Sequence, residues 1–297
     1  VTLLSPLYAG GSVTIVKGKV SLPAFWELVQ KHHANWTSVM PSILSILIRY
    51  GRKPESTPLK GIICGGQPLS RSVKDNFENT FGVPIFEGFG LTETTSFACF
   101  NEYPAEKRKT GIIGSPLSIN DMAIMDENCN ELGADKEGEI CIRGLNVAVE
   151  YLGLPEENHK AFKNDWFHSG DYGYRDEDGY YHFLSRHDAL IIKGGENVYP
   201  AEIENILFEH PAIIDCAVIG IPDTLLGEEI GAFIKLTDES MTEEVIREYF
   251  SGRIAGFKHP KHVFFLHDLD GLDEIPKGPT NKVLYRELRD YYLENLV

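Results

Sequence analysis

Residues 61–70 read Gly-Ile-Ile-Cys-Gly-Gly-Gln-Pro-Leu-Ser, and this stretch decides the fold class. The apolar run 61–64 predicts a short buried strand, which the following pair of glycines ends. Helical spacing covers residues 70–80, and a second apolar run at 83–86 predicts the next strand. A strand, a helix and a strand in this order are typical of βαβ units and a parallel sheet.

The same alternation continues toward the N-terminus. Residues 37–40 are strand-like, and Pro41 then stands where the first turn of a helix accepts proline. Residues 22–33 carry apolar side chains at helical spacing, and residues 13–16 form a further apolar run that predicts a strand. We therefore predict an α/β fold with a largely parallel sheet up to about residue 120.

Beyond residue 121 the pattern changes to β hairpins, with strands predicted at 122–125, 139–142 and 180–184 and a turn at 176–179. After Arg186 a compact α+β pattern begins. It predicts helices at 200–208, at 242–254 and from 283, and strands at 215–219, 230–236 and 263–266. We place a domain boundary at residues 186–188.

Composition limits the classes of function. A chain of 297 residues favours two domains, and its 42% hydrophobic content excludes disorder as the main state. Lys and Arg total 28 against 44 Asp and Glu, for a net charge of -16. Such an acidic surface repels nucleic acids and anionic membranes, whereas a few local donors can still bind a small phosphate.

The five cysteines form no C-x-x-C pair, which argues against a disulfide framework or a zinc ribbon and for a reducing, cytoplasmic compartment. No ligand spacing links His159, His168, His182 or His187 to Cys or Glu, so we expect no metal site there. No apolar run is long enough to span a membrane. The chain begins without Met or a charged leader, and we expect it to be a piece of a longer protein.

Several segments carry residues suited to binding a nucleotide. Gly65 and Gly66 end a strand just before a helix, where a ligand can approach the backbone. Residues 87–94, Glu-Gly-Phe-Gly-Leu-Thr-Glu-Thr, place an aromatic ring, a hydroxyl and a carboxylate in succession. Taken alone each segment also suits an ordinary tight turn, and the second lacks the third glycine of a dinucleotide fingerprint.

Three later segments have similar potential. In residues 165–171, Asp171 follows a glycine and can accept hydrogen bonds from a sugar diol, although it also suits a turn-stabilising role. Residues 185–204 lie on the domain boundary and include the pair Gly194 and Gly195. Residues 276–283 form a loop with two lysines before the last helix, and a lysine can stabilise a developing negative charge.

Taken together, these motifs resemble the adenylate-forming superfamily, which contains acyl-CoA synthetases, the adenylation domains of peptide synthetases and luciferases. The resemblance rests on runs that occur in order between Ser5 and Arg289: Gly-Gly-Gln-Pro-Leu at 65–69, Glu-Gly-Phe-Gly-Leu-Thr-Glu at 87–93, Gly-Glu-Ile-Cys-Ile-Arg-Gly at 138–144, Ser-Gly-Asp at 169–171, Arg-His-Asp at 186–188, Lys-Gly-Gly-Glu-Asn-Val-Tyr-Pro-Ala-Glu-Ile-Glu at 193–204 and Pro-Lys-Gly-Pro-Thr-Asn-Lys at 276–282. The last two runs look more like the acyl-CoA synthetase branch than like amino-acid-activating domains.

This resemblance implies a domain arrangement. Residues 1–187 would be the C-terminal part of a large AMP-binding domain, with a βαβ-type part to about 120 and a β-rich subdomain at 121–187. Residues 188–297 would be a small, mobile α+β lid domain.

The resemblance also implies a two-step reaction with ATP, Mg²⁺ and coenzyme A. A carboxylate attacks the α-phosphate of ATP to give an acyl-adenylate and pyrophosphate, and a thiol then displaces AMP. The nucleotide would be bound by Gly66, Gln67, Pro68, Glu87, Gly88, Phe89, Gly90, Leu91, Thr92, Asp171, Arg186 and Lys282. Phe89 would stack on the base and Thr92 would contact the α-phosphate, while Glu93 would hold Mg²⁺. Asp171 and Arg186 would bind the ribose hydroxyls.

The catalytic residues implied are Lys282, Thr92 and Glu93. Lys282 would bridge the α-phosphate and the attacking carboxylate. Asp188 would be the hinge about which the lid turns between the two half-reactions. The thiol channel would then be lined by Lys193, Gly194, Gly195 and Glu196.

Two departures from the family pattern matter. The Gly/Ser/Thr-rich phosphate loop and the first part of the acyl pocket do not occur in these 297 residues, so we expect the fragment alone to be inactive in adenylation. Asn281 stands where the family usually has glycine before the catalytic lysine, and Asn tolerates the same backbone.

The substrate and the acceptor stay open at this point. Phe97, Ala98 and Phe100 favour an apolar neighbourhood and hence a fatty acid. The acyl group could instead pass to the phosphopantetheine of an acyl carrier protein acting in trans, or the chain could be a non-catalytic module that binds AMP or an acyl-adenylate.

Overall fold

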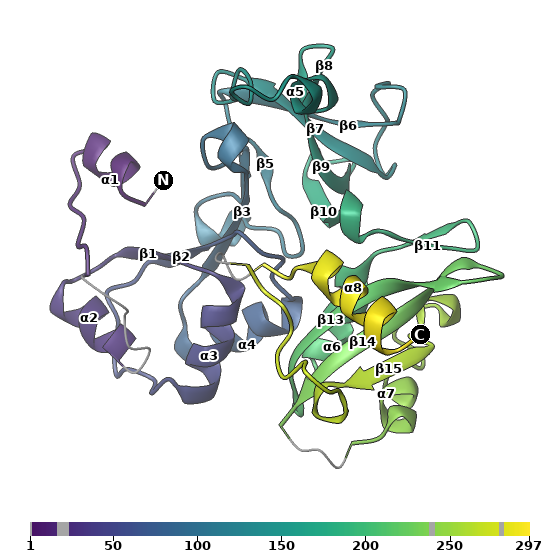
Figure 1. Cartoon of the computed structure of the whole chain (residues 1–297). Helices are drawn as coiled ribbons and strands as arrows, with labels where there is room; N and C mark the ends of the chain where they lie inside the picture. The colour runs from purple at the N-terminus through teal and green to yellow at the C-terminus, as the bar shows by residue number, and fades with distance from the viewer. Residues whose placement is uncertain (1, 17–23, 238–240, 279–281) are drawn as a thin grey trace. The chain divides into compact units, whose positions relative to one another are not determined.

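The computed structural model of this chain describes residues 2–16, 24–237, 241–278 and 282–297 (Figure 1). The chain divides into two compact units. Unit 1 contains Val1–Ser169 and Gly173–Phe183, and unit 2 contains Gly170–Tyr172 and Leu184–Val297. The domain boundary predicted at residues 186–188 lies close to the last of these changes of unit, and its role as a pivot stays a prediction.

The first sheet of unit 1 has the strand order β1-β2-β3-β4-β5. Its strands are β1 (Trp36–Val39), β2 (Gly61–Cys64), β3 (Ile85–Phe89), β4 (Cys99–Phe100) and β5 (Ser115–Pro116). The pairs β1–β2 and β2–β3 are parallel, whereas β3–β4 and β4–β5 are antiparallel. The predicted βαβ unit is therefore confirmed, but the parallel part of the sheet is limited to its first three strands.

The helices of this region begin and end where local chemistry favours it. They are α1 (Leu4–Tyr8), α2 (Phe25–Lys31), α3 (Pro41–Tyr50) and α4 (Arg71–Phe81). Pro41 occupies the first turn of α3. The Ser70 hydroxyl accepts a hydrogen bond from the Val73 amide at the start of α4, and Gly82 ends that helix with a φ of 70°. Helices α2, α3 and α4 bury their apolar faces against β2 and β3 in one core, which contains Trp26, Leu44, Leu47, Ile62, Phe77 and Ile85.

A second sheet follows in the chain, with the order β10-β9-β7-β6 and β8 paired to β9. Its strands are β6 (Asn120–Met125), β7 (Gly138–Gly144), β8 (Phe162–Lys163), β9 (Trp166–Arg175) and β10 (Tyr181–Arg186). The helix α5 (Pro155–Ala161) precedes β8. The β hairpins predicted beyond residue 121 are confirmed. The predicted turn at 176–179 is also confirmed, because the Gly179 amide donates a hydrogen bond to the Asp176 carbonyl.

Unit 2 is built on a third sheet of order β12-β11-β14-β13, with β15 paired to β14. Its strands are β11 (Ile191–Lys193), β12 (Glu196–Val198), β13 (Ile213–Asp223), β14 (Gly227–Leu236) and β15 (His262–Phe265). The helices are α6 (Pro200–Phe208), α7 (Glu243–Tyr249) and α8 (Tyr285–Asn295). Short 3₁₀ turns complete the chain as η2 (Thr92–Thr94), η3 (Ala105–Lys107), η4 (His187–Ala189), η5 (Gly256–Lys258) and η6 (Leu266–Asp268).

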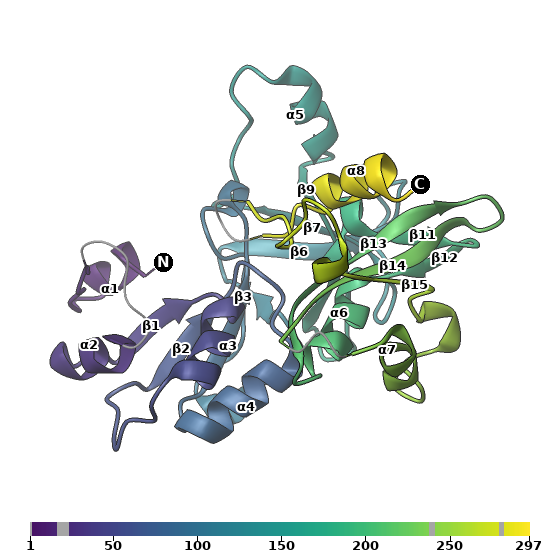
Figure 2. The ribbon, with the colours of Figure 1, turned by 60° about the horizontal axis from the view of Figure 1, so that its bottom comes forward.

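Side chains along β13 point alternately to the two faces of the sheet, and each face has its own hydrophobic core. Cys216 and Val218 point to the face covered by α6 and α7, whereas Ala217 and Ile219 point to the opposite face, on which Leu288 of α8 packs. Figure 2 shows α8 on one side of β13 and β14 and α6 and α7 on the other. The sheet of unit 2 is therefore buried on both faces, which accounts for its long apolar strands.

Two sequence predictions for the fold are wrong, and one strand was not predicted. Residues 13–16 are irregular and largely exposed, with Ile15 at 76% exposure. The helix predicted at 242–254 ends at Tyr249. Residues 166–171 lie in β9, a strand that the sequence did not predict, because its inward positions include Ser169 and Asp171 and so lack an apolar alternation. Within the described residues every helix is too short or too polar to cross a membrane.

Candidate functional site

Two of the predicted glycine motifs lie at one edge of the parallel sheet in unit 1. Cys64 at the end of β2 pairs with Glu87 in β3, so the loops after these strands start side by side. A Cβ atom on Gly65 would lie 2.7 Å from the Gly88 carbonyl oxygen. The two backbones therefore approach each other as only glycine permits. The carboxyl ends of parallel strands are where α/β sheets bind ligands.

The loop after β3 is held in one conformation by its own backbone. A Cβ atom on Gly90 would lie 1.7 Å from the Ser96 carbonyl oxygen, so no other residue fits there. The Thr94 hydroxyl accepts a hydrogen bond from the Leu91 amide at 2.9 Å. This packing leaves Thr92 exposed and fixes the start of the 3₁₀ turn that contains Glu93.

Glu93 is positioned by residues far along the chain. The Tyr151 hydroxyl donates a hydrogen bond to Glu93 Oε1 at 2.8 Å, and the Ala148 amide donates to the Glu93 carbonyl oxygen at 2.7 Å. Asn146 supports the same loop, because its side-chain amide donates to the Thr94 carbonyl at 3.1 Å. Tyr151 and Asn146 were not among the predicted site residues, because no local pattern links them to residues 92–95.

Glu87 has a buried partner that the sequence analysis also missed. Lys74 of α4 is 3% exposed, and its Nζ lies 3.6 Å from Glu87 Oε1 and 3.3 Å from the Thr110 hydroxyl. Burial raises the pKa of Glu87 to about 7, and the Lys74 charge opposes that rise. A lysine in an amphipathic helix is ordinarily read as solvated, so only the fold reveals this pair.

The other residues of unit 1 that were predicted to bind the nucleotide differ in their exposure to solvent. Gly66 and Pro68 are exposed, and Gln67 is half-buried. The Phe89 ring is also half-buried and packs against the core of the second sheet, with its centroid 6.3 Å from that of Phe183. The structure thus brings Gly65–Gln67 and Glu87–Glu93 to one edge, whereas their contact with a nucleotide stays a prediction.

In unit 2 the structure brings Asp171 and Arg186 together, whereas their contact with a ribose stays a prediction. Arg186 Nη1 lies 3.4 Å from Asp171 Oδ1, and Arg186 Nε lies 3.4 Å from Asp188 Oδ1. The Asp171 side chain is 4% exposed, whereas those of Arg186 and Asp188 are 43% and 74% exposed. The guanidinium therefore bridges a buried carboxylate and a solvated one.

The segment predicted to line a thiol channel is the hairpin between β11 and β12. Gly194 and Gly195 adopt φ values of 61° and 88°, which favour glycine, and Glu196 is exposed. Lys193, by contrast, forms an ion pair with Glu229, whose side chain is 5% exposed. This ion pair fixes Lys193 to β14, whereas residues 194–196 at the turn of the hairpin are exposed.

Two backbone hydrogen bonds join the chain before and after the loop that leads to Lys282. The Gly278 amide donates to the Lys282 carbonyl at 2.9 Å, and the Leu284 amide donates to the Pro276 carbonyl at 2.9 Å. Lys277 pairs with Asp215 of β13. Lys282 itself is exposed, and the departure noted at Asn281 lies outside the described residues.

Two sequence profiles decide the family. The profile of the AMP-binding enzyme family matches residues 1–152, and that of the AMP-binding enzyme C-terminal domain matches residues 202–272. The chain belongs to the AMP-binding enzymes. The resemblance read from the motifs is therefore confirmed.

Relatives of this AMP-binding enzyme are CoA ligases. It is 36% identical to an oxalate–CoA ligase of Arabidopsis thaliana over 98% of its own length and 57% of the relative, and 35% identical to a crotonobetaine/carnitine–CoA ligase of Citrobacter koseri over 95% of its length and 54% of the relative. The chain thus spans a little over half the length of these relatives.

Solved structures give the same picture. The o-succinylbenzoate CoA synthetase of Bacillus subtilis, in complex with its acyl-adenylate intermediate, superposes with a TM-score of 0.85 at 29% identity, over 97% of this chain and 57% of the other. ATP-bound MatB of Rhodopseudomonas palustris gives 0.86 at 29% identity, over 97% and 56%. The α/β fold of this AMP-binding enzyme is therefore that of adenylate-forming enzymes.

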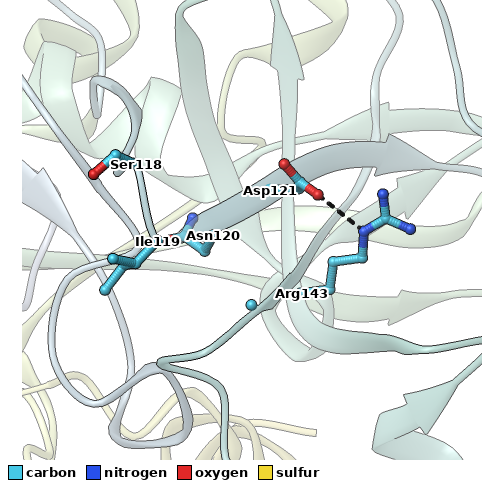
Figure 3. Close-up of a pocket in the computed structure, with 6 residues that line it drawn as sticks. Ser118, Ile119, Asn120, Asp121 and Arg143 are labelled. Atoms are coloured by element: carbon cyan, nitrogen blue, oxygen red, sulfur yellow. Dashed lines mark hydrogen bonds and ion pairs between the residues drawn. The ribbon is translucent and has the colours of Figure 1, made fainter.

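A surface pocket of about 350 Å³ lies in unit 1 of this AMP-binding enzyme, at the end of the 138–144 run (Figure 3). It is lined by Ser118, Ile119, Asn120, Asp121, Arg143 and Gly144. Arg143 Nε and Asp121 Oδ2 are 3.1 Å apart there, and both side chains are more than half exposed. This solvated ion pair forms a polar surface hollow that holds none of the predicted site residues.

One cluster of ligand-type side chains in this AMP-binding enzyme was also missed. Glu139, Cys141 and His168 bring a carboxylate oxygen, a sulfur and a ring nitrogen within 4.8 Å of one another. The sequence expectation of no metal site at His168 rested on the lack of a short-range ligand spacing. The partners lie on a neighbouring strand almost thirty positions away, where no short-range spacing shows them.

Proposed function

We propose that this chain takes part in the ATP-dependent conversion of a carboxylic acid to its acyl-adenylate and in the transfer of the acyl group to the thiol of coenzyme A. The observation that carries the proposal is the match to both AMP-binding profiles in a chain whose motif residues gather at two defined places, the sheet edge of unit 1 and the Asp171–Arg186 pair. The CoA ligase activity of the relatives supports the acceptor.

Two groups of residues are proposed to bind the nucleoside. Asp171 is a buried carboxylate whose charge Arg186 balances, so it can accept hydrogen bonds from two ribose hydroxyls. Hydrogen bonds to a charged acceptor contribute about 1.5–3 kcal/mol each. Gly66, Gln67 and Pro68 would border the adenine, and Phe89 would stack on it.

The phosphate end is proposed to lie on the loop after β3. Thr92 is exposed and can donate its hydroxyl to the α-phosphate. Glu93 presents a carboxylate, the oxygen ligand that Mg²⁺ prefers, and the Tyr151 hydroxyl fixes its orientation. When bound, Mg²⁺ would neutralise negative charge on the phosphates.

Lys282 is proposed to supply the cation that acts at the reacting atoms. Two anions, the carboxylate and the α-phosphate, must meet for the adenylate to form, and a positive charge between them stabilises the transition state. The hydrogen bond from the Gly278 amide to the Lys282 carbonyl holds the backbone of this lysine. Asp188 would be the pivot that carries Lys282 away before Gly194, Gly195 and Glu196 line the path of the thiol, with Lys193 anchored at its side.

A fatty acid is the substrate class we favour. The Phe97 ring lies beside both strand-end glycines, 3.5 Å from a Cβ built on Gly65 and 2.9 Å from one built on Gly88, and it packs against Phe100. These aromatic side chains at the sheet edge suit a substrate with an alkyl chain better than a substrate with a second charged group. One relative in Escherichia coli O157:H7, 34% identical over 76% of this chain and 39% of the relative, is a long-chain-fatty-acid–CoA ligase. A cytoplasmic location, inferred from the unpaired cysteines, belongs to the same proposal.

The experiment supplies the chain with a synthetic fatty acyl-adenylate and coenzyme A and measures the thioester by mass spectrometry. We expect thioester formation that is lost in the Asp171→Asn variant, and we expect no pyrophosphate release when the same chain receives ATP and fatty acid. AMP binding without any thioester would contradict the enzymatic proposal and identify a binding module. Transfer to an acyl carrier protein but not to coenzyme A would contradict the proposed acceptor.

A further inference from the structure

The cluster around His168 lies in the second sheet of unit 1 and is independent of the function proposed above. His168 Nδ1 is 2.7 Å from Glu139 Oε2 and 3.4 Å from Cys141 Sγ. On the other side of the ring, Nε2 is 3.9 Å from Cys129 Sγ. The imidazole therefore stands between two sulfur atoms and a carboxylate.

The sheet itself brings these side chains together. Glu139 and Cys141 are two positions apart on β7, so they point to the same face. His168 lies on the neighbouring strand β9, which the Ser169 hydroxyl ties to β7 through the Ile140 carbonyl at 2.6 Å. Because three ligand atoms come from paired strands, their separation is set by the ladder and not by a mobile loop.

Cys129 reaches the cluster from a turn that is also held in place. The Asp126 carboxylate accepts hydrogen bonds from the Asn128 and Asn130 amides at 2.9 and 2.8 Å, and the Cys129 amide donates to the Asp126 carbonyl at 3.0 Å. Cys129 is half-buried and packs against the small core that contains Cys141.

Burial distinguishes this cluster from a surface ion pair. Cys141 is 0% exposed, and the side chains of His168 and Glu139 are 6% and 24% exposed. Burial and the nearby Glu139 charge raise the pKa of the Cys141 thiol.

The ligand types select a class of cation. Sulfur, ring nitrogen and carboxylate oxygen together suit Zn²⁺ and similar borderline-soft divalent ions, while Mg²⁺ and Ca²⁺ prefer oxygen alone. In a tetrahedral zinc site with Zn–N of about 2.05 Å and Zn–S of about 2.3 Å, the nitrogen and sulfur lie about 3.5 Å apart. The 3.4 Å between His168 Nδ1 and Cys141 Sγ matches that edge. The Glu139 oxygen, which lies 2.7 Å from His168 Nδ1, must move away from that nitrogen before both can bind one ion. The Glu139 side chain is 24% exposed and therefore has room to move.

We propose that Glu139, Cys141 and His168 form a binding site for a zinc-class divalent cation, with a solvent molecule as the fourth ligand. His168 binds through Nδ1, and Cys129 Sγ accepts a hydrogen bond from Nε2–H and holds the ring in that tautomer. Binding converts the Cys141 thiol to a thiolate, and the thiol proton passes to solvent.

The test uses Co²⁺ as the probe, added to the metal-stripped 297-residue chain. We expect a thiolate-to-cobalt charge-transfer band in the near ultraviolet that saturates at one equivalent and disappears when Zn²⁺ displaces the cobalt. Cys141→Ser removes the band, and His168→Gln weakens cobalt binding by at least about tenfold. Cys129→Ala keeps the band but weakens binding by about tenfold, as expected of an outer partner.

Cys99→Ser is the matched control, because Cys99 is also a fully buried thiol of unit 1 but donates to the Ile113 carbonyl at 3.3 Å. It should leave both band and affinity unchanged. Melting curves recorded without metal show whether each variant is folded, and Zn²⁺ should raise the melting temperature of the unaltered chain but not that of His168→Gln. Absence of the band at saturating Co²⁺, or its persistence in Cys141→Ser, overturns the proposal and leaves a His–Glu ion pair beside two thiols.

Discussion

The Tyr285 hydroxyl donates a hydrogen bond to the buried Glu204 carboxylate, with its oxygen 3.2 Å from Oε1 and 3.3 Å from Oε2. Tyr285 begins α8, three positions after Lys282, and Glu204 lies on α6. The Val218 amide donates to the same carboxylate at 2.9 Å, so Glu204 joins α6, β13 and the start of α8. The segment that follows the proposed catalytic lysine is thereby fixed to the core of unit 2.

Burial raises the pKa of Glu204 to about 7 from 4.5, against the opposing hydrogen bonds from Val218 and Tyr285. Between these two pH values the folded chain holds a proton that the unfolded chain has lost, so stability falls as pH rises through this window. Glu204→Gln should therefore be more stable than the unaltered chain at pH 8, by up to roughly 3 kcal/mol. The advantage should vanish near pH 4.5.

Urea unfolding at several pH values checks this prediction. Glu202→Gln is the control, because Glu202 lies on the same helix but is 41% exposed and pairs with Lys258. It should change stability by less than about 1 kcal/mol at every pH. An advantage of Glu204→Gln that does not depend on pH would contradict the explanation by proton uptake.

Lys74→Met should destabilise unit 1 by about 3–5 kcal/mol at pH 8, because it leaves the buried Glu87 charge without a partner. The loss should shrink at pH 5, where Glu87, with its raised pKa of about 7, takes up a proton. The double variant Lys74→Met/Glu87→Gln should recover most of the loss, which denaturant titration of the four members of the cycle measures. Additive losses in the double variant would mean that the pair is not coupled.

Gly90→Ala should disrupt the loop after β3, because its new Cβ atom has no space beside the Ser96 carbonyl. Overpacking of this kind costs about 1–3 kcal/mol or more. Gly133→Ala offers a matched comparison, since a Cβ atom there meets no atom within 4 Å and φ is not positive. Differential scanning calorimetry should show a lower melting temperature for the first variant and an unchanged or slightly higher one for the second.

Tyr151→Phe tests the role proposed for Glu93. Loss of the hydroxyl removes the hydrogen bond that orients the carboxylate, and such outer partners are worth about 10–100-fold in metal affinity. The Mg²⁺ concentration for half-maximal adenylation should rise by about that factor in a form that also carries an ATP phosphate loop. Tyr50→Phe, at an exposed position at the end of α3, should leave it unchanged. A normal Mg²⁺ requirement in Tyr151→Phe would argue against Glu93 as the ligand.

In a form that also carries an ATP phosphate loop, Lys282→Ala should slow acyl-adenylate formation by about 10²–10³, the loss seen when one preorganised donor is removed. Thioester formation from a supplied adenylate should change far less, because the proposed swing of the lid removes this lysine from the second step. Pyrophosphate release and thioester yield, measured side by side, separate the two. Arg286→Ala removes an exposed charge nearby on α8 and should affect neither. Equal losses in both half-reactions with Lys282→Ala would overturn its role.

Local patterns predicted much of the fold. The strand at 61–64 and the helix at 200–208 were predicted with the bounds that the structure shows, because apolar spacing and the first-turn proline define them within a few residues. Residues 13–16 have the same apolar character but pair with no strand among the described residues. Propensity alone does not make a strand when the partner is absent.

Partners far apart in sequence explain what could not be predicted. Tyr151 contacts Glu93 across 58 positions, and Lys74 contacts Thr110 across 36. In β9 the inward positions Ser169, Asp171 and Gly173 carry small or charged residues because they serve close packing and an ion pair, so the strand has no apolar signature. Family motifs gave the predicted site residues, whereas the residues that hold these side chains in place became visible only in the fold.

The assignment of Gly170–Tyr172 to unit 2 has a consequence for anyone who divides this protein. A gene split between Phe183 and Leu184 would leave Asp171 on one product and its partner Arg186 on the other. Separate expression of the two halves would therefore break the Asp171–Arg186 ion pair, and Arg186 would keep only its contact with Asp188 of these two carboxylates. A clean dissection needs a circularly permuted or grafted chain in which this tripeptide travels with the C-terminal half.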